Sequence, residues 1–410
     1  MTSSKEVSDL EHRYRQDFPI LQSGDYVYLD SAATSLKPQC VVDSIHHYYT
    51  SLSANVHRGV YHEAYETTRL YEEARETIAH FIHANPEEII YTRGATQALN
   101  FVAMTFAEHL LQAGDEVIVS ELEHHSLLLP FQALCARKQA SLIYVPLTKD
   151  GKITLENLSA VVTSKTKLIA LHMVSNVFGY RAPIEEITAF AHQKNIYVVV
   201  DGAQAVQHFP IDVKAMDVDF FAFSGHKMLG PTGIGVLYGK RQLLEKLAPL
   251  EYGGDMNDFV SKTVSEWKDI PHRFEAGTMP IASVLGLAEA VKYLEKTTLE
   301  QIEHDTTRLY RYTFQQLKKI PGITIYNPHS DAGLIAFNID NVHPHDAASF
   351  YAEQQIALRA GHHCAQLVIQ WLSIEACLRA SLYFYNTFAD ADRFIETTKA
   401  AVRFFKSVGF

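Results

Sequence analysis

The sequence lacks a long apolar run, a secretory leader and an excess of positive charge. No apolar segment approaches the roughly 18 residues that a membrane-spanning helix needs, and residues 1–18 are charged throughout, with no apolar core of a signal peptide. A net charge of -11 argues against general electrostatic binding of nucleic acid or anionic membrane. We therefore expect a cytoplasmic protein.

Cysteine is also scarce. The four cysteines, Cys40, Cys135, Cys364 and Cys377, share no CxxC spacing, which excludes a disulfide framework and fits a reducing compartment. The chain shows no internal repeat and no low-complexity segment. With 410 residues, 47% of them hydrophobic and 20% charged, it has the composition of a globular protein of two or three domains.

Short apolar segments alternate with amphipathic helical ones in the first two thirds of the chain. This alternation predicts βαβ units, and hence an α/β fold with a mainly parallel sheet covered by helices on both faces. Such sheets bind ligands at the carboxyl ends of their strands. The expected strands are Ile89–Tyr91, Val117–Val119, Leu142–Val145, Leu168–Val174, Ile196–Val200, Phe220–Phe223 and Ile234–Tyr238.

The two ends of the chain have a different pattern. Residues 1–25 are expected to form a helical arm, and residues 286–410 a smaller α+β unit that begins with one long amphipathic helical region, 288–318. We therefore predict a large α/β domain over 26–285 and a small domain built from 1–25 and 286–410.

A lysine follows directly after one of the buried strands. Lys227 lies in the stretch DVDFFAFSGHKMLGPTGIG, residues 217–235. A desolvated lysine loses its proton easily and becomes a nucleophile. A bare Gly-His-Lys is more often part of a surface loop. Here the wider pattern favours a functional lysine, because it also contains Asp219, Ser224, His226 and the glycine turn.

Other polar residues are expected at neighbouring strand ends. Asp201 follows four apolar residues and needs a cationic partner, such as a protonated pyridine nitrogen, unless it caps a helix. Gly94-Ala95-Thr96 opens a helix and offers a phosphate site, to which Ser224 and His226 add donors. His124 suits stacking or proton transfer, with His125 pointing elsewhere, whereas Asn176 and Gln204 suit a phenolic oxygen.

A second centre is the stretch Arg359-Ala360-Gly361-His362-His363-Cys364. Its cationic groups favour a reactive thiolate at Cys364, whereas the other three cysteines are interpreted as structural. A metal bound by adjacent His-His-Cys residues is disfavoured by geometry. Arg379 lies in an apolar strand and needs an anion, such as a substrate carboxylate.

These stretches together resemble the group II, SufS-type cysteine desulfurases of the class V aminotransferase group of pyridoxal phosphate (PLP) enzymes. The resemblance covers nearly the whole chain. It is carried by His57-Arg58-Gly59, GATQALN, ELEHHS, HMVSNVFG, VDGAQAV, FSGHKMLGPTGIG, RFEAGT, RAGHHCA and CLRASLYFYNT. It implies the type I PLP fold, with a seven-stranded, mainly parallel sheet.

The resemblance also implies residue roles. Lys227 binds PLP, His124 stacks on it, Asp201 pairs with its ring nitrogen, and Cys364 accepts sulfur. The implied cofactor set is Thr96, His124, Asn176, Asp201, Gln204, Ser224, His226, Lys227 and Thr278. The implied substrate set is Arg379, Arg359, Asn176, Ala33, His57 and Arg58. Thr278 is expected to reach the partner subunit's phosphate, which implies a homodimer.

The implied reaction converts L-cysteine to L-alanine and leaves a persulfide on Cys364, supplying sulfur for iron-sulfur clusters. A selenocysteine lyase or a cysteine sulfinate-active enzyme would use the same site, whereas an aminotransferase or kynureninase would not need Cys364. A nicotinamide dehydrogenase is disfavoured because no G-x-G-x-x-G follows an early strand. A sulfur-relay protein would not need Lys227.

The stretch Val342-His343-Pro344-His345-Asp346 is expected to open a helix. His345 or Asp346 could simply cap that helix. Alternatively, His345 could ligate the zinc of a partner and free one of its thiolates to take sulfur from Cys364. The resemblance implies such a partner, a small zinc-containing acceptor of the SufU type.

Overall fold

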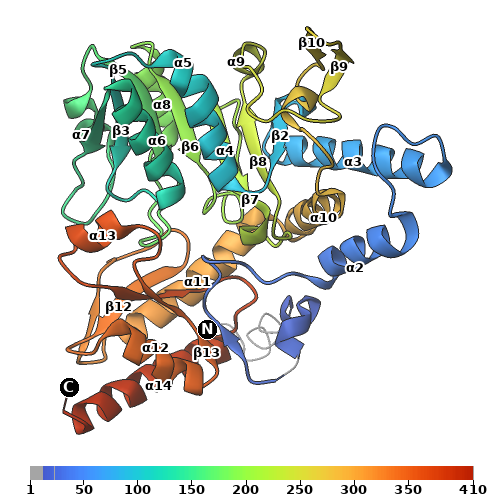
Figure 1. Cartoon of the computed structure of the whole chain (residues 1–410). Helices are drawn as coiled ribbons and strands as arrows, with labels where there is room; N and C mark the ends of the chain where they lie inside the picture. The colour runs from blue at the N-terminus through green and yellow to red at the C-terminus, as the bar shows by residue number, and fades with distance from the viewer. Residues whose placement is uncertain (1–12, 23, 410) are drawn as a thin grey trace.

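A computed structural model describes residues 13–22 and 24–409 (Figure 1). Residues 1–12 of the expected helical arm lie outside the described residues. The part of the arm that is described is not an α-helix but two short 3₁₀ helices, η1 (Arg15–Asp17) and η2 (Pro19–Gln22). No helix in the described ranges is long and apolar enough to cross a membrane.

The expected mainly parallel sheet is confirmed. Its seven strands run in the order β2-β8-β7-β6-β5-β3-β4. All neighbours from β4 to β7 are parallel, whereas β8 is antiparallel to both β7 and β2. The strands are β2 (Ile89–Thr92), β3 (Glu116–Ser120), β4 (Ser141–Val145), β5 (Thr166–His172), β6 (Tyr197–Asp201), β7 (Phe220–Ser224) and β8 (Gly235–Gly239).

Both faces of this sheet are buried. Successive side chains of a strand point to opposite faces, and in β7 both sets are apolar. In β7, Phe221 and Phe223 belong to one apolar cluster, and Phe220 and Ala222 to another. Helices surround the sheet (Figure 1). They are α3 (His62–Phe81), α4 (Ala95–Val102), α5 (Glu108–Leu110), α6 (His125–Lys138), α7 (Leu155–Val161), α8 (Ile184–His192), α9 (Arg241–Leu244) and α10 (Ile281–Thr297), with α2 (Gln39–His47) packed on α10.

The C-terminal part holds a second, antiparallel sheet in the order β11-β12-β15-β14. Its strands are β11 (Ile323–Ile325), β12 (Leu334–Ile339), β14 (Arg359–Gly361) and β15 (Cys377–Ser381), and its helices are α11 (Leu299–Leu317), α12 (Pro344–Glu353), α13 (Gln366–Trp371) and α14 (Phe388–Ser407). The expected helical region 288–318 is confirmed as helical, but it is not one continuous helix. It is split between α10 and α11 at Thr298, whose φ of 64° interrupts the helix.

One N-terminal strand packs with this C-terminal part. β1 (Val27–Tyr28) pairs in parallel with β13 (Ile356–Ala357), and Val27 and Leu29 share an apolar cluster with β12 and β15. The division of the chain at residues 25 and 285 stays a prediction. The sequence analysis also missed the hairpin of β9 (Asn257–Val260) and β10 (Ser265–Trp267).

Candidate active site

A cavity of about 190 Å³ lies where β5, β6 and β7 end and where the C-terminal sheet meets the large one. It brings together most of the residues singled out in the sequence. Its lining is Ala32, Ala33, Ala95, Thr96, His124, Ser126, Asn176, Asp201, Ala203, Ser224, His226, Lys227, Arg359, His363, Cys364 and Arg379. A larger groove beside α2, α3 and α10 is lined by several carboxylates and lacks this set of nucleophiles.

Lys227 is the nucleophilic amine of this cavity. It ends the 3₁₀ turn η6 (Gly225–Lys227), which directly follows β7. Burial lowers the pKa of its ammonium group, the Asp201 carboxylate opposes that shift, and the positive charge of Arg379 adds to it. The lowered pKa makes the neutral, nucleophilic form of the amine more accessible than in a solvated lysine.

Asp201 is the last residue of β6 and is 6% exposed. Burial raises the pKa of its carboxyl group, and Lys227 counteracts the shift. The N–H of Ala203 donates to Asp201 Oδ1 at 2.9 Å. A cationic group bound in the cavity would keep this carboxylate ionised.

A buried histidine supports Asp201 from the neighbouring strand, and the sequence analysis missed it. His172 on β5 is the register partner of Asp201. Its Nδ1 lies 2.9 Å from Glu123 Oε1, and its backbone N–H donates to Glu123 Oε2 at 2.8 Å. Burial of the His172 ring lowers its pKa, but the Glu123 carboxylate outweighs this effect and raises the pKa above its ordinary value.

The turn before α4 has the properties of a phosphate site. Gly94, with φ 153°, precedes the helix, and the N–H of Ala95 donates to Ser224 Oγ at 2.8 Å. A Cβ on Gly235 would lie 2.4 Å from Gly94 Cα, so glycine allows β8 to pass close to this turn. The hydroxyls of Thr96, at the start of α4, and Ser126, at the start of α6, are 2.6 Å apart. Ser126 was not predicted as a site residue.

His124 forms another wall of the cavity and caps α6. Its Nδ1 accepts a hydrogen bond from the Ser126 N–H at 3.1 Å. Burial and the nearby Lys227 charge lower its pKa to about 3. The ring is therefore neutral, with its proton on Nε2, and suits stacking on an aromatic ring. His226 is also neutral, because burial lowers its pKa to about 4.

Cys364 lies on an exposed loop, with φ 53°. His363 does not contribute to the cationic surroundings expected from the sequence, because its ring is buried. His363 Nε2 lies 3.0 Å from the Cys377 carbonyl, and burial holds its pKa well below its usual value. His362 Nε2 lies 3.0 Å from the carbonyl of Glu375. Arg359 and Arg379 are positively charged side chains on the lining of the cavity that also holds Cys364.

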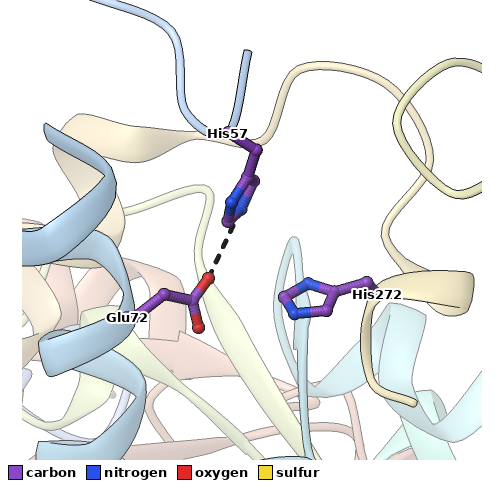
Figure 2. Close-up of side chains that lie close together, drawn as sticks. All are labelled: His57, Glu72 and His272. Atoms are coloured by element: carbon purple, nitrogen blue, oxygen red, sulfur yellow. Dashed lines mark ion pairs between the residues drawn. The ribbon is translucent and has the colours of Figure 1, made fainter. Parts of the chain in front are cut away.

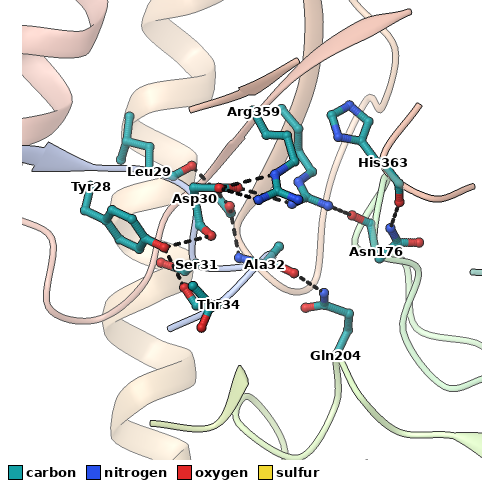
Figure 3. A network of polar contacts seen from close by, with 12 residues as sticks. Tyr28, Leu29, Asp30, Ser31, Ala32, Thr34, Asn176, Gln204, Arg359 and His363 are labelled. Carbon is teal, nitrogen blue, oxygen red and sulfur yellow. Dashed lines mark hydrogen bonds and ion pairs between the residues drawn. The ribbon is translucent and has the colours of Figure 1, made fainter. Parts of the chain in front are cut away.

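Asp30 joins the two arginines of the cavity, a role that the sequence analysis missed, and Figure 3 shows its contact with Arg359. Arg359 donates to Asp30 Oδ2 from Nε and Nη2 at 3.2 and 3.1 Å. Arg379 donates from Nη2 to Asp30 Oδ1 at 3.4 Å, and from Nη1 to the Asn176 carbonyl at 2.7 Å. Arg379 Nε is buried without a hydrogen-bond partner, so the guanidinium retains a donor for a bound anion.

Several predicted residues do not line the cavity. Gln204 donates from Nε2 to the Ala32 carbonyl at 2.6 Å, just behind the lining (Figure 3). Thr278 is exposed, and Arg58 pairs with Asp255 at 2.6 Å. His57 lies beside Glu72 and His272. Their cofactor and substrate roles stay predictions.

His345 is exposed at the start of α12. The alternative that His345 or Asp346 caps this helix is wrong. The cap is His343, whose Nδ1 accepts the backbone N–H of His345 at 3.3 Å. The His345 ring is therefore not needed as a cap.

Comparisons with known proteins agree with this geometry. The family model described as aminotransferase class-V matches residues 27–394. A probable cysteine desulfurase of Halalkalibacterium halodurans is 46% identical over 402 residues, covering 97% of this chain and 99% of the relative. A probable cysteine desulfurase of Staphylococcus aureus is 46% identical over 397 residues, covering 95% and 96%.

Two solved structures have the same fold. The cysteine desulfurase CsdA (S-sulfonic acid) from Escherichia coli superposes with a TM-score of 0.90 at 40% identity, covering 96% of this chain and 98% of that one. The apo cysteine desulfurase from Thermococcus onnurineus NA1 has a TM-score of 0.91 at 35% identity, covering 98% and 99%.

Proposed function

The chain belongs to the aminotransferase class-V family, and we propose that it is a PLP-dependent cysteine desulfurase that converts L-cysteine to L-alanine and leaves the sulfur as a persulfide on Cys364. The observation that carries the proposal is that Lys227 and Cys364 line one cavity, although they lie on different parts of the chain. An aminotransferase would need the first residue and not the second.

The cavity fits PLP. Lys227 offers an amine with a lowered pKa for the aldehyde, and Asp201 offers a buried carboxylate for the ring nitrogen. Thr96, Ser126 and the Ala95 turn suit the phosphate, and the neutral ring of His124 suits the pyridine face. Bound PLP would supply an electron sink that acidifies Cα of the substrate.

The protein's own residues would perform the remaining tasks. Arg379 and Arg359, held by Asp30, would orient the substrate carboxylate, and Lys227 would move the proton at Cα. The Cys364 thiolate would attack the substrate sulfur, so that an S–S bond forms as the C–S bond breaks. Cysteine plus thiol gives alanine plus persulfide, so the reaction needs no external oxidant or reductant.

We extend the proposal to a SufS-type role in iron-sulfur cluster assembly, in a cytoplasmic homodimer. The support is the motif pattern and the exposed position of Thr278, which leaves it available to a second subunit. The proposed acceptor is a small zinc-containing protein of the SufU type, with the exposed His345 as its zinc ligand. The proposed domains remain 26–285, and 1–25 with 286–410.

The second candidate activity is selenocysteine lyase, because sulfur and selenium differ little in size. An assay of alanine with sulfide or selenide, run with each amino acid and a thiol, tests both activities. Alanine and sulfide in equal amounts from L-cysteine support the desulfurase. Turnover of selenocysteine alone would favour the lyase.

A further inference from the structure

Three side chains meet outside the cavity described above (Figure 2). His57, Glu72 and His272 each offer one ligand atom, and these atoms all lie within 4.8 Å of one another. None of the three lines the Lys227 cavity of the same chain. They come from a loop, from the middle of α3 and from the 3₁₀ turn η7 (His272–Phe274).

Two imidazoles and one carboxylate are a ligand set for a transition metal. Zinc binds such sets at about 2.0–2.2 Å from each ligand atom, with a fourth position left for water. Tetrahedral geometry at that distance separates the ligand atoms by roughly 3.4 Å. His57 Nε2 and Glu72 Oε1 are already 3.3 Å apart, so only His272 has to approach, by at most about 1.4 Å.

The Glu72 carboxylate is oriented for metal binding by a neighbouring arginine. Arg75 Nε donates to Glu72 Oε2 at 3.2 Å, whereas Glu72 Oε1 is buried and accepts no hydrogen bond. Arg75 is 2% exposed and is fixed by two hydrogen bonds of 2.8 Å to Glu275. Partners that orient a ligand in this way are characteristic of metal sites.

The charge around the three side chains also suits a cation. Glu72 and Glu275 carry two negative charges, and Arg75 neutralises one of them. The remaining negative charge lies next to two imidazoles. The hydrogen bonds of Arg75 connect α3 to Glu275, three residues beyond His272, so two of the ligands are held on a rigid base.

The third ligand is held by its backbone. The N–H of His57 donates to Thr68 Oγ1 at 2.9 Å, which fixes the loop on α3 one turn before Glu72. The rings of His57 and His272 are 5.4 Å apart and lie edge to face. The His57 ring also packs edge to face on Tyr71, and its Nε2 already faces Glu72 Oε1 at 3.3 Å, so this nitrogen is directed toward the proposed ion.

We propose that His57, Glu72 and His272 bind one divalent ion of the zinc class per chain, with a water in the fourth position. The ion would clamp the loop around His57 to the segment that leads to Thr278. None of the three side chains lines the Lys227 cavity of the same chain, so zinc binding can be measured separately from desulfurase activity.

The test is a calorimetric zinc titration of the PLP-loaded protein, without an affinity tag and with Cys364→Ala to remove the exposed thiol. We expect one zinc per chain and a zinc-dependent rise of Tm. His272→Gln and Glu72→Gln should each weaken zinc binding at least tenfold and abolish the rise of Tm. His304→Gln, which changes an exposed histidine beside Asp305, is the matched control and should bind zinc like the parent.

Two results would overturn the proposal. One is a parent protein that binds no zinc at micromolar concentration. The other is His272→Gln or Glu72→Gln with the affinity of the parent, which would place the ion elsewhere. If either variant is poorly folded, the absorption spectrum of the parent protein after addition of Co²⁺ is the test instead. Tetrahedral Co²⁺ absorption bands support the site, and their absence contradicts it.

Discussion

The backbone N–H of His125 donates a hydrogen bond of 2.7 Å to the carbonyl oxygen of Cys364. The ring of the same histidine accepts the backbone N–H of Gln366 at 3.1 Å. His124, the preceding residue, forms a wall of the Lys227 cavity. One turn at the start of α6 therefore positions both the cavity wall and the loop that carries the thiol.

His125→Ala removes the ring acceptor for Gln366 and should loosen the Cys364 loop. One hydrogen bond contributes about 1 kcal/mol, so we expect roughly a fivefold slower persulfide formation. PLP content should not change, because His124 keeps its cap. Rapid-quench measurement of the first turnover checks this expectation, and His125→Gln, which retains an acceptor, is the control. Equal rates for wild type and His125→Ala would remove this positioning role.

Arg379→Ala should raise KM for cysteine without loss of PLP. Truncating one partner of a buried charge pair costs about 2 kcal/mol or more, which corresponds to roughly a 30-fold rise. Asp30→Asn should raise KM less, because both guanidinium groups remain but are no longer held. Steady-state kinetics with PLP absorbance as the loading control provide the measurement. Unaltered kinetics of Arg379→Ala would exclude it from the substrate site.

His345→Ala should retain basal activity but lose stimulation by a zinc-containing acceptor. His343→Ala should affect stimulation less, yet it removes the cap of α12 and should destabilise the protein by about 1 kcal/mol. Alanine production with and without the acceptor distinguishes the two variants. Urea unfolding measures how much stability is lost when the His343 cap is removed. Equal stimulation of wild type and His345→Ala would argue against the zinc-ligand role.

His208 is 6% exposed, packs edge to face on Tyr383, and lies outside the cavity. Burial lowers its pKa from the ordinary 6.5 to about 3. The folded state therefore excludes a proton that the unfolded state binds. Above pH 6.5 neither state binds this proton, so His208 does not change the free energy of unfolding. As the pH falls from 6.5 toward 3, only the unfolded state binds it, and the free energy of unfolding drops by up to about 1.4 kcal/mol per pH unit.

His208→Phe keeps the ring contact and removes the titrating group. Urea unfolding of the variant should show a shallower loss of stability between pH 6.5 and 5 than the wild type does. Identical slopes would show that His208 takes up no proton on unfolding in this pH range, and would contradict its lowered pKa.

The sequence predicted the main sheet because its strands are apolar on both faces, as in β7. It also predicted Lys227, Asp201 and His124 together, because polar residues that follow parallel strands meet at one edge. The β9–β10 hairpin was missed because nearly all of its side chains are exposed, so no buried face imposes a period-two pattern.

Contacts between distant segments could not be predicted in the same way. Asp30 lies 329 residues from Arg359 and 349 from Arg379, and nothing in its local sequence indicates that it holds both. His57 was predicted from a motif, but its neighbours Glu72 and His272 become visible only in the folded chain. Likewise, the contact of the His363 ring with the Cys377 carbonyl depends on the position of β15.

The most direct test of the proposed function is mass spectrometry of Cys364 after one turnover with L-cysteine, combined with quantification of alanine. We predict one alanine per active site and one added sulfur atom on Cys364. Cys364→Ala should keep its PLP yet form no persulfide, and Lys227→Ala should form neither product. Substantial alanine from Lys227→Ala, or sulfur found on another cysteine of the wild type, would contradict the account.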